Sequence, residues 1–263
     1  MAEMEKSNNF IAMEHDVLKF WEDNNCYEKR KENVLENISF SVQPGQTVGI
    51  IGSTGSGKTS LVQLIPRLYD VTEGQITLDG HDIKQIPLKV LRESIAYVPQ
   101  DSMLFSDTIA RNIAFGKHDA TMDEIMEAAK DACVHENIID FTEQYETVVG
   151  ERGVTLSGGQ KQRCAIARAL LKESSVLILD DSLSAVDTDT EEHILRNLKE
   201  NRQGKTMIII AHRISTIEQM DKILFIEDGK LIAVGTHSEL YNNCPAYQKM
   251  VDLQKLEAEG GNE

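Results

Sequence analysis

The sequence predicts an α/β fold with a core of parallel strands, and three features support this prediction. A glycine-rich loop at 52–59 lies between the apolar run 48–51 and a segment whose apolar residues recur at helical spacing. The runs 176–179 and 207–210 are apolar throughout, which is typical of parallel strands buried on both faces. A chain of 263 residues, 41% of them apolar, can bury one large core or a two-lobed one.

Charge and cysteine content narrow the function classes. The formal net charge is −16, and the sequence has no basic stripe of the kind that binds nucleic acid. The four cysteines are scattered without zinc or thioredoxin spacing, which predicts reduced, intracellular thiols. No apolar run is long enough to span a bilayer. Glutamates near the amino terminus interrupt the apolar stretch that a secretory signal would need. We therefore expect a soluble, cytoplasmic chain that does not bind nucleic acid.

The first part of the chain alternates between strand and turn patterns. Residues 1–33 are polar and are expected to be mostly helical, as an extension before the main domain. Alternating apolar residues predict a strand at 35–42. A strand at 75–78 enters a hairpin-type turn at Asp79-Gly80, and 95–98 is another short strand.

The later elements follow from periodicity and turn residues. Residues 107–150 are predicted to be rich in helix, because their apolar residues recur at helical spacing. The strands 223–226 and 231–234 bracket Asp228-Gly229, which predicts a hairpin. Residues 257–263 are expected to form a disordered tail.

The loop at 52–59 has the complete pattern G-x-x-x-x-G-K-T, with a strand before it and a helix after it. This context predicts a phosphate-binding loop, because the glycines let backbone N–H groups converge on phosphate oxygens. Lys58 is expected to reach the β- and γ-phosphates, and the hydroxyl of Thr59 to hold Mg²⁺. A chance glycine-rich turn would lack the flanking elements. The candidate ATP ligands are Gly52, Ser53, Thr54, Gly55, Ser56, Gly57, Lys58, Thr59 and Ser60.

A carboxylate follows the apolar run 176–179 directly. Asp180 ends this predicted strand well downstream of the phosphate loop, which is the Walker B arrangement in which a carboxylate meets the metal. The alternative is an aspartate that caps the next helix.

The segment Leu156-Ser157-Gly158-Gly159-Gln160 precedes a predicted helix. Alone it would be a flexible turn with a helix cap, but here it lies between a phosphate loop and a Walker B strand. In this order the sequence resembles the ATP-binding-cassette (ABC) family, whose signature is LSGGQ, over residues 34–256. The resemblance implies a P-loop NTPase with a RecA-like parallel-sheet core, an antiparallel β subdomain and an α-helical signature subdomain at about 101–170.

The resemblance also implies roles for four further motifs. Gln100 would touch Mg²⁺ and sense the transmembrane partner, and His212 would contact the γ-phosphate. The segment 184–187, with Asp187, is similar to the D-loop that crosses the dimer interface. The segment 149–153 is similar to the exporter loop that meets the membrane domains. The alternatives are a solvent-exposed amide at Gln100, a structural histidine at His212 and an ordinary helix cap at 184–187.

The implied assembly is a dimer of two cassettes that sandwich two ATP molecules head to tail, attached to the transmembrane domains of an exporter. Each site would use the phosphate loop of one chain, with Mg²⁺ held by Thr59, Gln100 and Asp180. The signature would act in trans, pointing a helix N-terminus at the partner's phosphate. The chain would then lie at the inner face of the cell membrane. The residues implied to act in trans are Leu156, Ser157, Gly158, Gly159 and Gln160.

Asp181 departs from the family pattern. A glutamate normally follows the Walker B aspartate and positions the attacking water, whereas Asp181 is shorter by one methylene. Misplacing a base by about 1 Å can cost on the order of a hundredfold in rate. The combination of an intact signature with Asp181 is similar to the degenerate-site subunit of heterodimeric ABC exporters. The alternative is an ordinary symmetric ATPase in which Asp181 is an adequate base.

The amino-terminal residues are a second departure. ABC cassettes begin with a strand and an aromatic residue that stacks on adenine, and Tyr27 lies at about the expected distance before the loop. Residues 17–25 instead resemble the amino-terminal helix of isoleucyl-tRNA synthetases, although the HIGH and KMSKS motifs are absent. We expect that foreign residues replace the upstream part of a transporter here.

Two other functions remain open at this stage. One is a non-hydrolysing, nucleotide-binding regulatory module, which would differ from the hydrolysing cassette only in whether Asp181 can position the attacking water. A soluble ABC ATPase of DNA repair or translation is disfavoured by the acidic charge and the exporter-like loops. A GTPase is disfavoured because the guanine-reading motif N-K-x-D is absent. The partner cassette is expected to be a different chain, with a homodimer as the alternative.

Overall fold

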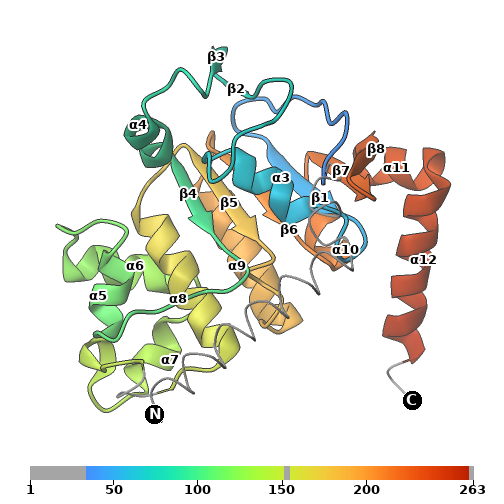
Figure 1. The fold of residues 1–263 in the computed structure, drawn as a ribbon. Coiled ribbons are helices and arrows are strands. Elements are labelled where there is room, and N and C mark those ends of the chain that lie inside the picture. The colour runs from blue at the N-terminus through green and yellow to red at the C-terminus, as the bar shows by residue number, and fades with distance from the viewer. Residues whose placement is uncertain (1–33, 151–154, 261–263) are drawn as a thin grey trace, which may run out of the picture.

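A six-stranded sheet forms the centre of the computed structural model, which describes residues 34–150 and 155–260 (Figure 1). The strand order is β4-β5-β6-β1-β7-β8. The first five strands in this order are mutually parallel and β8 is antiparallel to β7, which confirms the predicted parallel-sheet α/β class and the C-terminal hairpin. The strands are β1 (Thr47–Ile51), β4 (Ile95–Val98), β5 (Val176–Asp180), β6 (Thr206–Ile210), β7 (Lys222–Glu227) and β8 (Lys230–Gly235).

The register of the parallel strands brings their carboxyl ends to one edge. Asp180, the last residue of β5, pairs with Ile210, the last residue of β6, and Ile50 near the end of β1 also pairs with Ile210. The loop after β1, the segment after β4 and the residues after β6 therefore emerge side by side. Ligand sites of open parallel sheets lie at this edge.

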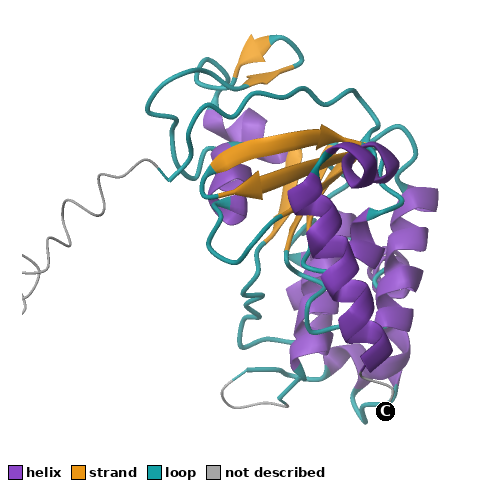
Figure 2. Ribbon diagram, turned by 90° about the vertical axis from the view of Figure 1, so that its right-hand side faces the viewer, coloured by secondary structure: helices purple, strands orange, loops and turns teal. Residues whose placement is uncertain are grey.

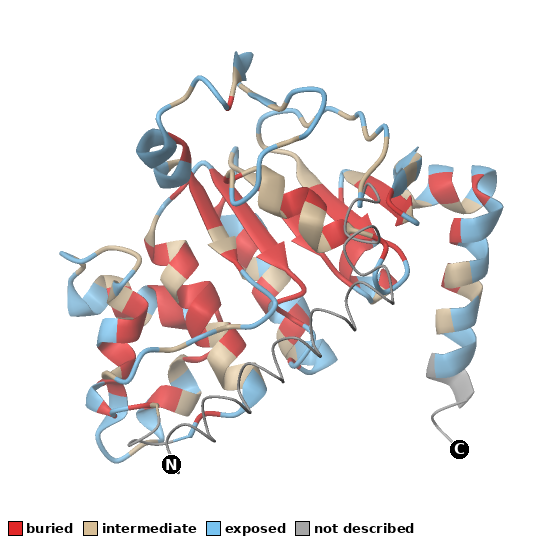
Figure 3. Cartoon of the chain, in the orientation of Figure 1, coloured by how far each residue is buried: buried red, intermediate tan, exposed pale blue. Residues whose placement is uncertain are grey.

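Helices cover both faces of the sheet, and most of them gather on one side in Figure 2. Successive apolar residues of the strands alternate between two buried clusters, which places one cluster on each face of the sheet. The central strands are mostly buried (Figure 3). The smaller cluster packs α3 (Lys58–Leu64) and α4 (Leu88–Glu93) against the sheet. The helices that contribute to the larger cluster are α5 (Ile109–Ala114), α6 (Met122–Asp131), α7 (His135–Ile139), α8 (Gly158–Leu171), α9 (Thr188–Asn201), α10 (Ile214–Ile217), α11 (His237–Asn243) and α12 (Pro245–Gly260).

The starts of α8 and α9 are fixed by local sequence. Ser157 accepts a hydrogen bond from the backbone N–H of Gln160, whose side chain in turn accepts one from the Ser157 N–H, so that the two form a capping box. Asp187 caps α9 by accepting from the N–H of Thr190. These caps fix the residues at which α8 and α9 begin.

Two expectations from the sequence are corrected by the structure. Residues 35–42 do not form a strand, although their exposure still alternates, and only a single bridge joins Glu36 to Lys230. A strand needs a hydrogen-bonded neighbour, and within the described residues none runs beside this segment. Besides the antiparallel pair β7–β8, the described strands include a second, short antiparallel pair, β2 (Thr77–Leu78) and β3 (His81–Asp82).

The carboxyl terminus also differs from the prediction, because α12 continues to Gly260 through part of the expected disordered tail. The 3₁₀ helix η1 (Gln144–Glu146) completes the described elements. Among the helices of residues 34–150 and 155–260, none combines the length and apolar character needed to cross a membrane.

The sheet core predicts a clear contrast between two isoleucines. Ile178 on β5 is 0% exposed, and Ile178→Ala is expected to lower the free energy of unfolding by about 2–5 kcal/mol, because it leaves a cavity between the layers. Ile232 on β8 is 47% exposed, and Ile232→Ala should change it by about 0.5 kcal/mol or less. Urea unfolding of both variants measures the difference, and equal losses would contradict this packing.

Candidate functional site

The loop between β1 and α3 has a conformation that demands glycine. A Cβ on Gly52 would lie 1.8 Å from the carbonyl oxygen of Ile226, so only glycine fits against β7. Gly55 and Gly57 have φ angles of +80° and +95°, in the left-handed region that side chains disfavour. The predicted phosphate loop is therefore folded back on the sheet edge, and Gly57 is the residue from which α3 begins.

Lys58 lies inside this loop and is 6% exposed. Its ammonium donates hydrogen bonds to the carbonyl oxygens of Gly52 at 2.9 Å and Ser53 at 2.8 Å. Burial lowers the pKa of Lys58, and the carboxylates of Asp181 and Asp180 partly oppose that shift. The Ser56 hydroxyl is buried in the same loop without a hydrogen-bond partner in the structure. A bound phosphate would give the Ser56 hydroxyl the acceptor that it lacks in the loop.

Thr59 and Asp180 meet at the start of α3. The Thr59 hydroxyl donates to Oδ1 of Asp180 at 2.8 Å, and Asp180 is 1% exposed at the end of β5. A hydroxyl and a carboxylate are the hard oxygen ligands that Mg²⁺ prefers, so this pair fits the predicted metal site. The structure thus brings together residues that are 121 positions apart.

The second oxygen of Asp180 has a partner that sequence analysis missed. The Tyr97 hydroxyl on β4 donates to Oδ2 of Asp180 at 2.7 Å. Burial, and then this hydrogen bond, raise the pKa of Tyr97 far above its usual value, so the hydroxyl stays protonated and remains a donor. The only pattern that could have indicated it was a tyrosine in the otherwise apolar strand 95–98.

Asp181 lies at the centre of a second group. Its Oδ2 accepts from the Gln100 amide nitrogen at 3.1 Å and is 3.6 Å from Nε2 of His212. Burial raises the pKa of Asp181, and the nearby His212 opposes the shift. Gln100 therefore bonds to Asp181 instead of joining the pair of Thr59 and Asp180, where a metal contact was predicted.

The backbone of Asp181 is in the left-handed region, with φ at +48°. Aspartate tolerates this conformation better than most side chains, because its short polar group can bond locally. The hydroxyl of Ser184 donates to the Asp181 carbonyl oxygen at 2.9 Å and holds this turn. The residue at the position of the expected catalytic glutamate is thus also the residue at a strained turn.

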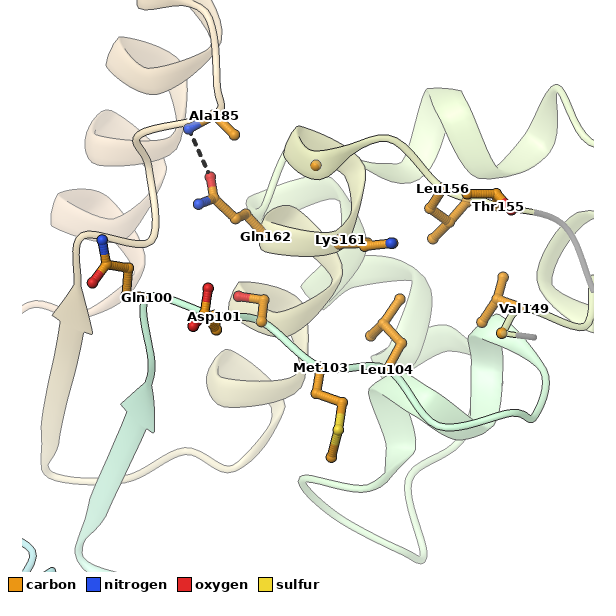
Figure 4. Close-up of a pocket in the computed structure, with 13 residues that line it drawn as sticks. Gln100, Asp101, Met103, Leu104, Val149, Thr155, Leu156, Lys161, Gln162 and Ala185 are labelled. Carbon is orange, nitrogen blue, oxygen red and sulfur yellow. Dashed lines mark hydrogen bonds between the residues drawn. The ribbon is translucent and has the colours of Figure 1, made fainter. Parts of the chain in front are cut away.

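The signature segment contacts the turn before α9 within the same chain. Gln162 accepts from the N–H of Ala185 at 3.0 Å, the contact drawn as a dashed line in Figure 4, and donates to the Ser184 hydroxyl at 3.3 Å. A Cβ on Gly159 would lie 2.7 Å from the Ala185 carbonyl oxygen, so this glycine is needed for close packing. Sequence analysis did not identify Gln162, since nothing local distinguishes it from other helix amides.

Two of the signature side chains have roles inside this chain. Leu156 is buried in the larger core cluster, and the Gln160 side chain completes the capping box. The action of the five signature residues on a partner chain stays a prediction, and these two side chains also have contacts within their own chain. Ser157 and Gly158 remain exposed at the beginning of the 14-residue helix α8. Tyr27, the candidate for adenine stacking, lies outside the described residues.

The residues that follow β6 are held by hydrogen bonds to α12 on one side and to the segment around α9 on the other. The sequence did not predict these contacts. Gln254 on α12 donates to the His212 carbonyl oxygen at 2.7 Å and accepts from the Ile214 N–H at 2.9 Å. Arg213 donates to the Val186 carbonyl oxygen at 3.2 Å and pairs with the buried Glu191. His212 is thereby fixed relative to both α12 and the segment 184–187.

A cavity of about 570 Å³ opens beside Gln100, between the segment that follows this residue and the start of α8 (Figure 4). Met103 on its rim is 68% exposed. Its lining residues come from three separate parts of the chain, namely Gln100, Asp101, Ser102, Met103, Leu104, Val149, Gly150, Thr155, Leu156, Gly158, Lys161, Gln162 and Ala185.

A strand, a glycine-rich loop and a helix, with a buried carboxylate at the end of another parallel strand of the same sheet, define a P-loop nucleotide-binding domain. The sequence model of the ABC transporter family matches residues 35–184, which is more than half of the chain. The chain therefore belongs to the ABC transporter family and is an ATP-binding, ATPase-type domain of it.

Two relatives and one solved structure illustrate the similarity. A putative multidrug export ATP-binding/permease protein YgaD of Bacillus subtilis is 49% identical over 230 residues, covering 88% of this chain and 40% of the relative. A heavy metal tolerance protein of Schizosaccharomyces pombe is 47% identical over 226 residues, covering 86% and 27%. A bacterial Atm1-family ABC exporter with ATP bound matches with a TM-score of 0.83 at 43% identity, covering 86% and 40%. The chain thus spans about 40% or less of the length of these proteins.

The two glycines of the signature are predicted to respond in opposite directions. Gly159→Ala should lower the free energy of unfolding by about 1–3 kcal/mol, because the new methyl group would press on the Ala185 carbonyl. For Gly158→Ala the nearest atom is 3.5 Å away, an ordinary contact, so this control should gain about 0.5–1 kcal/mol from lost glycine flexibility. Urea unfolding of both variants checks this, and a stable Gly159→Ala would contradict the packing.

Proposed function

We propose that this chain binds MgATP, dimerises with a second cassette and drives an ABC exporter by ATP hydrolysis. The observation that carries the proposal is the pairing of Thr59 with Asp180 beside the buried Lys58, at the sheet edge where the glycine loop turns. A phosphate chain and its metal need this combination of a cation, a hydroxyl and a carboxylate. Bound Mg²⁺ would neutralise charge on the phosphates, held by Thr59 and Asp180.

The residues of this chain have separate roles in the proposed reaction. Lys58 and the loop N–H groups stabilise phosphate charge, and His212 contacts the γ-phosphate. Asp181 holds and polarises the attacking water, but it works slowly for two reasons. Its side chain is one methylene shorter than glutamate, and its carboxylate is already engaged by Gln100 and lies close to His212.

Dimerisation is supported by the exposed start of α8. Ser157 and Gly158 present the N-terminus of a 14-residue helix, and a helix N-terminus attracts a phosphate held by another chain. The same chain carries both a slow site at Asp181 and an intact signature. In a heterodimer, the intact signature would serve a partner that has a competent base, while the site at Asp181 stays slow. A homodimer is the alternative.

The membrane-domain partner is proposed to dock at the cavity beside α8. Its lining combines apolar residues such as Met103 and Leu104 with Gln100, which bonds to Asp181. A segment pressed into this cavity would reach the site through Gln100. Assembly there would place the chain at the inner face of a membrane, consistent with the exporter names of its relatives.

Replacing the short base tests the proposed slow site. Asp181→Glu is expected to raise steady-state MgATP turnover by roughly tenfold to a hundredfold, because the longer side chain brings its carboxylate nearer the water. Turnover should rise more than linearly with protein concentration if the active form is a dimer. The measurement is phosphate release by the purified chain at several protein concentrations.

The control for this experiment is Lys58→Ala, which should abolish turnover in both backgrounds because phosphate charge is no longer balanced. Equal activity of the unaltered chain and Asp181→Glu would overturn the slow-site proposal. If neither turns over ATP while both bind it, the chain is the non-hydrolysing regulatory module or requires its partner cassette. Adding a cassette that carries glutamate at this position separates these two outcomes.

A charge at the rim of the cavity tests docking. Met103→Glu should weaken co-purification with the permease portion of the Bacillus subtilis relative by roughly tenfold, or ~1.4 kcal/mol, because a carboxylate must then be desolvated at the interface. ATP binding by the free chain should not change. Leu253→Glu is the control, since Leu253 is an apolar residue on the distant α12 that is 50% exposed. Equal loss in both variants would contradict docking at this cavity.

A further inference from the structure

Both oxygens of the buried Asp180 carboxylate are engaged, and the two donors come from different elements. Oδ1 accepts from Thr59 on α3 at 2.8 Å, and Oδ2 accepts from Tyr97 on β4 at 2.7 Å. Thr59 belongs to the phosphate loop, whereas Tyr97 has no role in the proposed reaction so far. Asp180 therefore has one partner on Oδ1, the oxygen proposed to face the metal, and another partner on Oδ2.

An aspartate needs such a second partner to keep a fixed orientation. The last torsion of the aspartate side chain has a broad energy minimum, so its carboxylate turns easily unless hydrogen bonds hold it. Tyr97 lies on the strand next to β5, with Ile178 as its register partner. Its ring spans the remaining distance to the Asp180 carboxylate, where the hydroxyl donates to Oδ2.

We propose that Tyr97 is a positioning residue for the metal site, whose hydroxyl fixes the plane of the Asp180 carboxylate so that Oδ1 stays turned toward Thr59 and Mg²⁺. This inference rests on the proposed function, because it assumes that the Thr59–Asp180 pair receives the metal of MgATP. Tyr97 itself touches neither nucleotide nor metal in this arrangement. Outer partners of metal ligands commonly contribute tenfold to a hundredfold to metal affinity.

The same segment controls both carboxylates of the site. Three residues after Tyr97, Gln100 bonds to Asp181 at 3.1 Å, so residues 97–100 hold Asp180 and Asp181 through separate hydrogen bonds. Tyr97 anchors the end of β4 from which Gln100 and the lining of the cavity extend. A loss at Tyr97 should therefore appear first in metal affinity rather than in affinity for the nucleotide alone.

The test is Tyr97→Phe in the full chain, with Mn²⁺ as the probe for the metal. ATP affinity is measured by calorimetry in EDTA and again with saturating Mn²⁺, and the ratio of the two gives the gain due to metal. We expect this gain to fall about tenfold in Tyr97→Phe, with ATP affinity in EDTA unchanged. The electron paramagnetic resonance spectrum of bound Mn²⁺ should also change, because the orientation of the Asp180 carboxylate changes. Tyr69→Phe, at a tyrosine that is 66% exposed, should keep the full gain.

The outcomes separate this inference from the proposed function. If Mn²⁺ gives no gain even in the unaltered chain, the proposed metal site itself fails. If the gain is present and Tyr97→Phe retains it, only the role of Tyr97 is overturned. Equal losses with and without metal would show a merely structural role and also overturn it. If Tyr97→Phe does not fold, Tyr97→Met decides, since it also removes the hydroxyl that holds Asp180. The gain due to metal should again fall about tenfold, and an unchanged gain overturns the inference.

Discussion

The buried charge of Asp180 is the constraint on which the rest of the site depends. A carboxylate that is 1% exposed must find hydrogen-bond donors inside the protein, because its desolvation costs several kcal/mol otherwise. The donors come from α3 and β4, and the ammonium of Lys58 lies nearby. The parallel register aligns the ends of the strands, and this alignment brings the hydrogen-bond donors to Asp180. The same contacts therefore fix both the fold and the site.

Hydrogen bonds link Asp181 to the surface that a second cassette would meet in the proposed dimer. Ser184 bonds to the Asp181 carbonyl, and Gln162 bonds to Ser184 and Ala185, so a short chain of hydrogen bonds joins the site to the signature helix. The packing of Gly159 against Ala185 leaves little room for the two segments to move separately. A shift at one nucleotide site would therefore move the surface offered to the other site.

The sequence allowed prediction of those parts that depend on local patterns. The phosphate loop, the buried strands and Asp180 follow from glycines, apolar runs and one carboxylate in order, and the parallel sheet is confirmed. The prediction of a strand at 35–42 was wrong, because a strand also needs a hydrogen-bonded neighbour that the pattern does not reveal. Tyr97 and Gln254 were missed because their partners lie 83 and 42 residues away, and only the folded chain brings them together.

The electrostatics of the site favour a metal complex of the nucleotide over the nucleotide alone. Two adjacent carboxylates face one buried ammonium, and the whole chain carries a net charge of −16. Lys58 already donates to the carbonyl oxygens of Gly52 and Ser53, so an entering phosphate must replace these bonds rather than meet a free cation. A bound divalent cation, which Asp180 and Thr59 would hold, would lower the repulsion between the carboxylates and the phosphates. Metal binding and nucleotide binding should for this reason be strongly coupled, and any residue that fixes the Asp180 carboxylate acts on both.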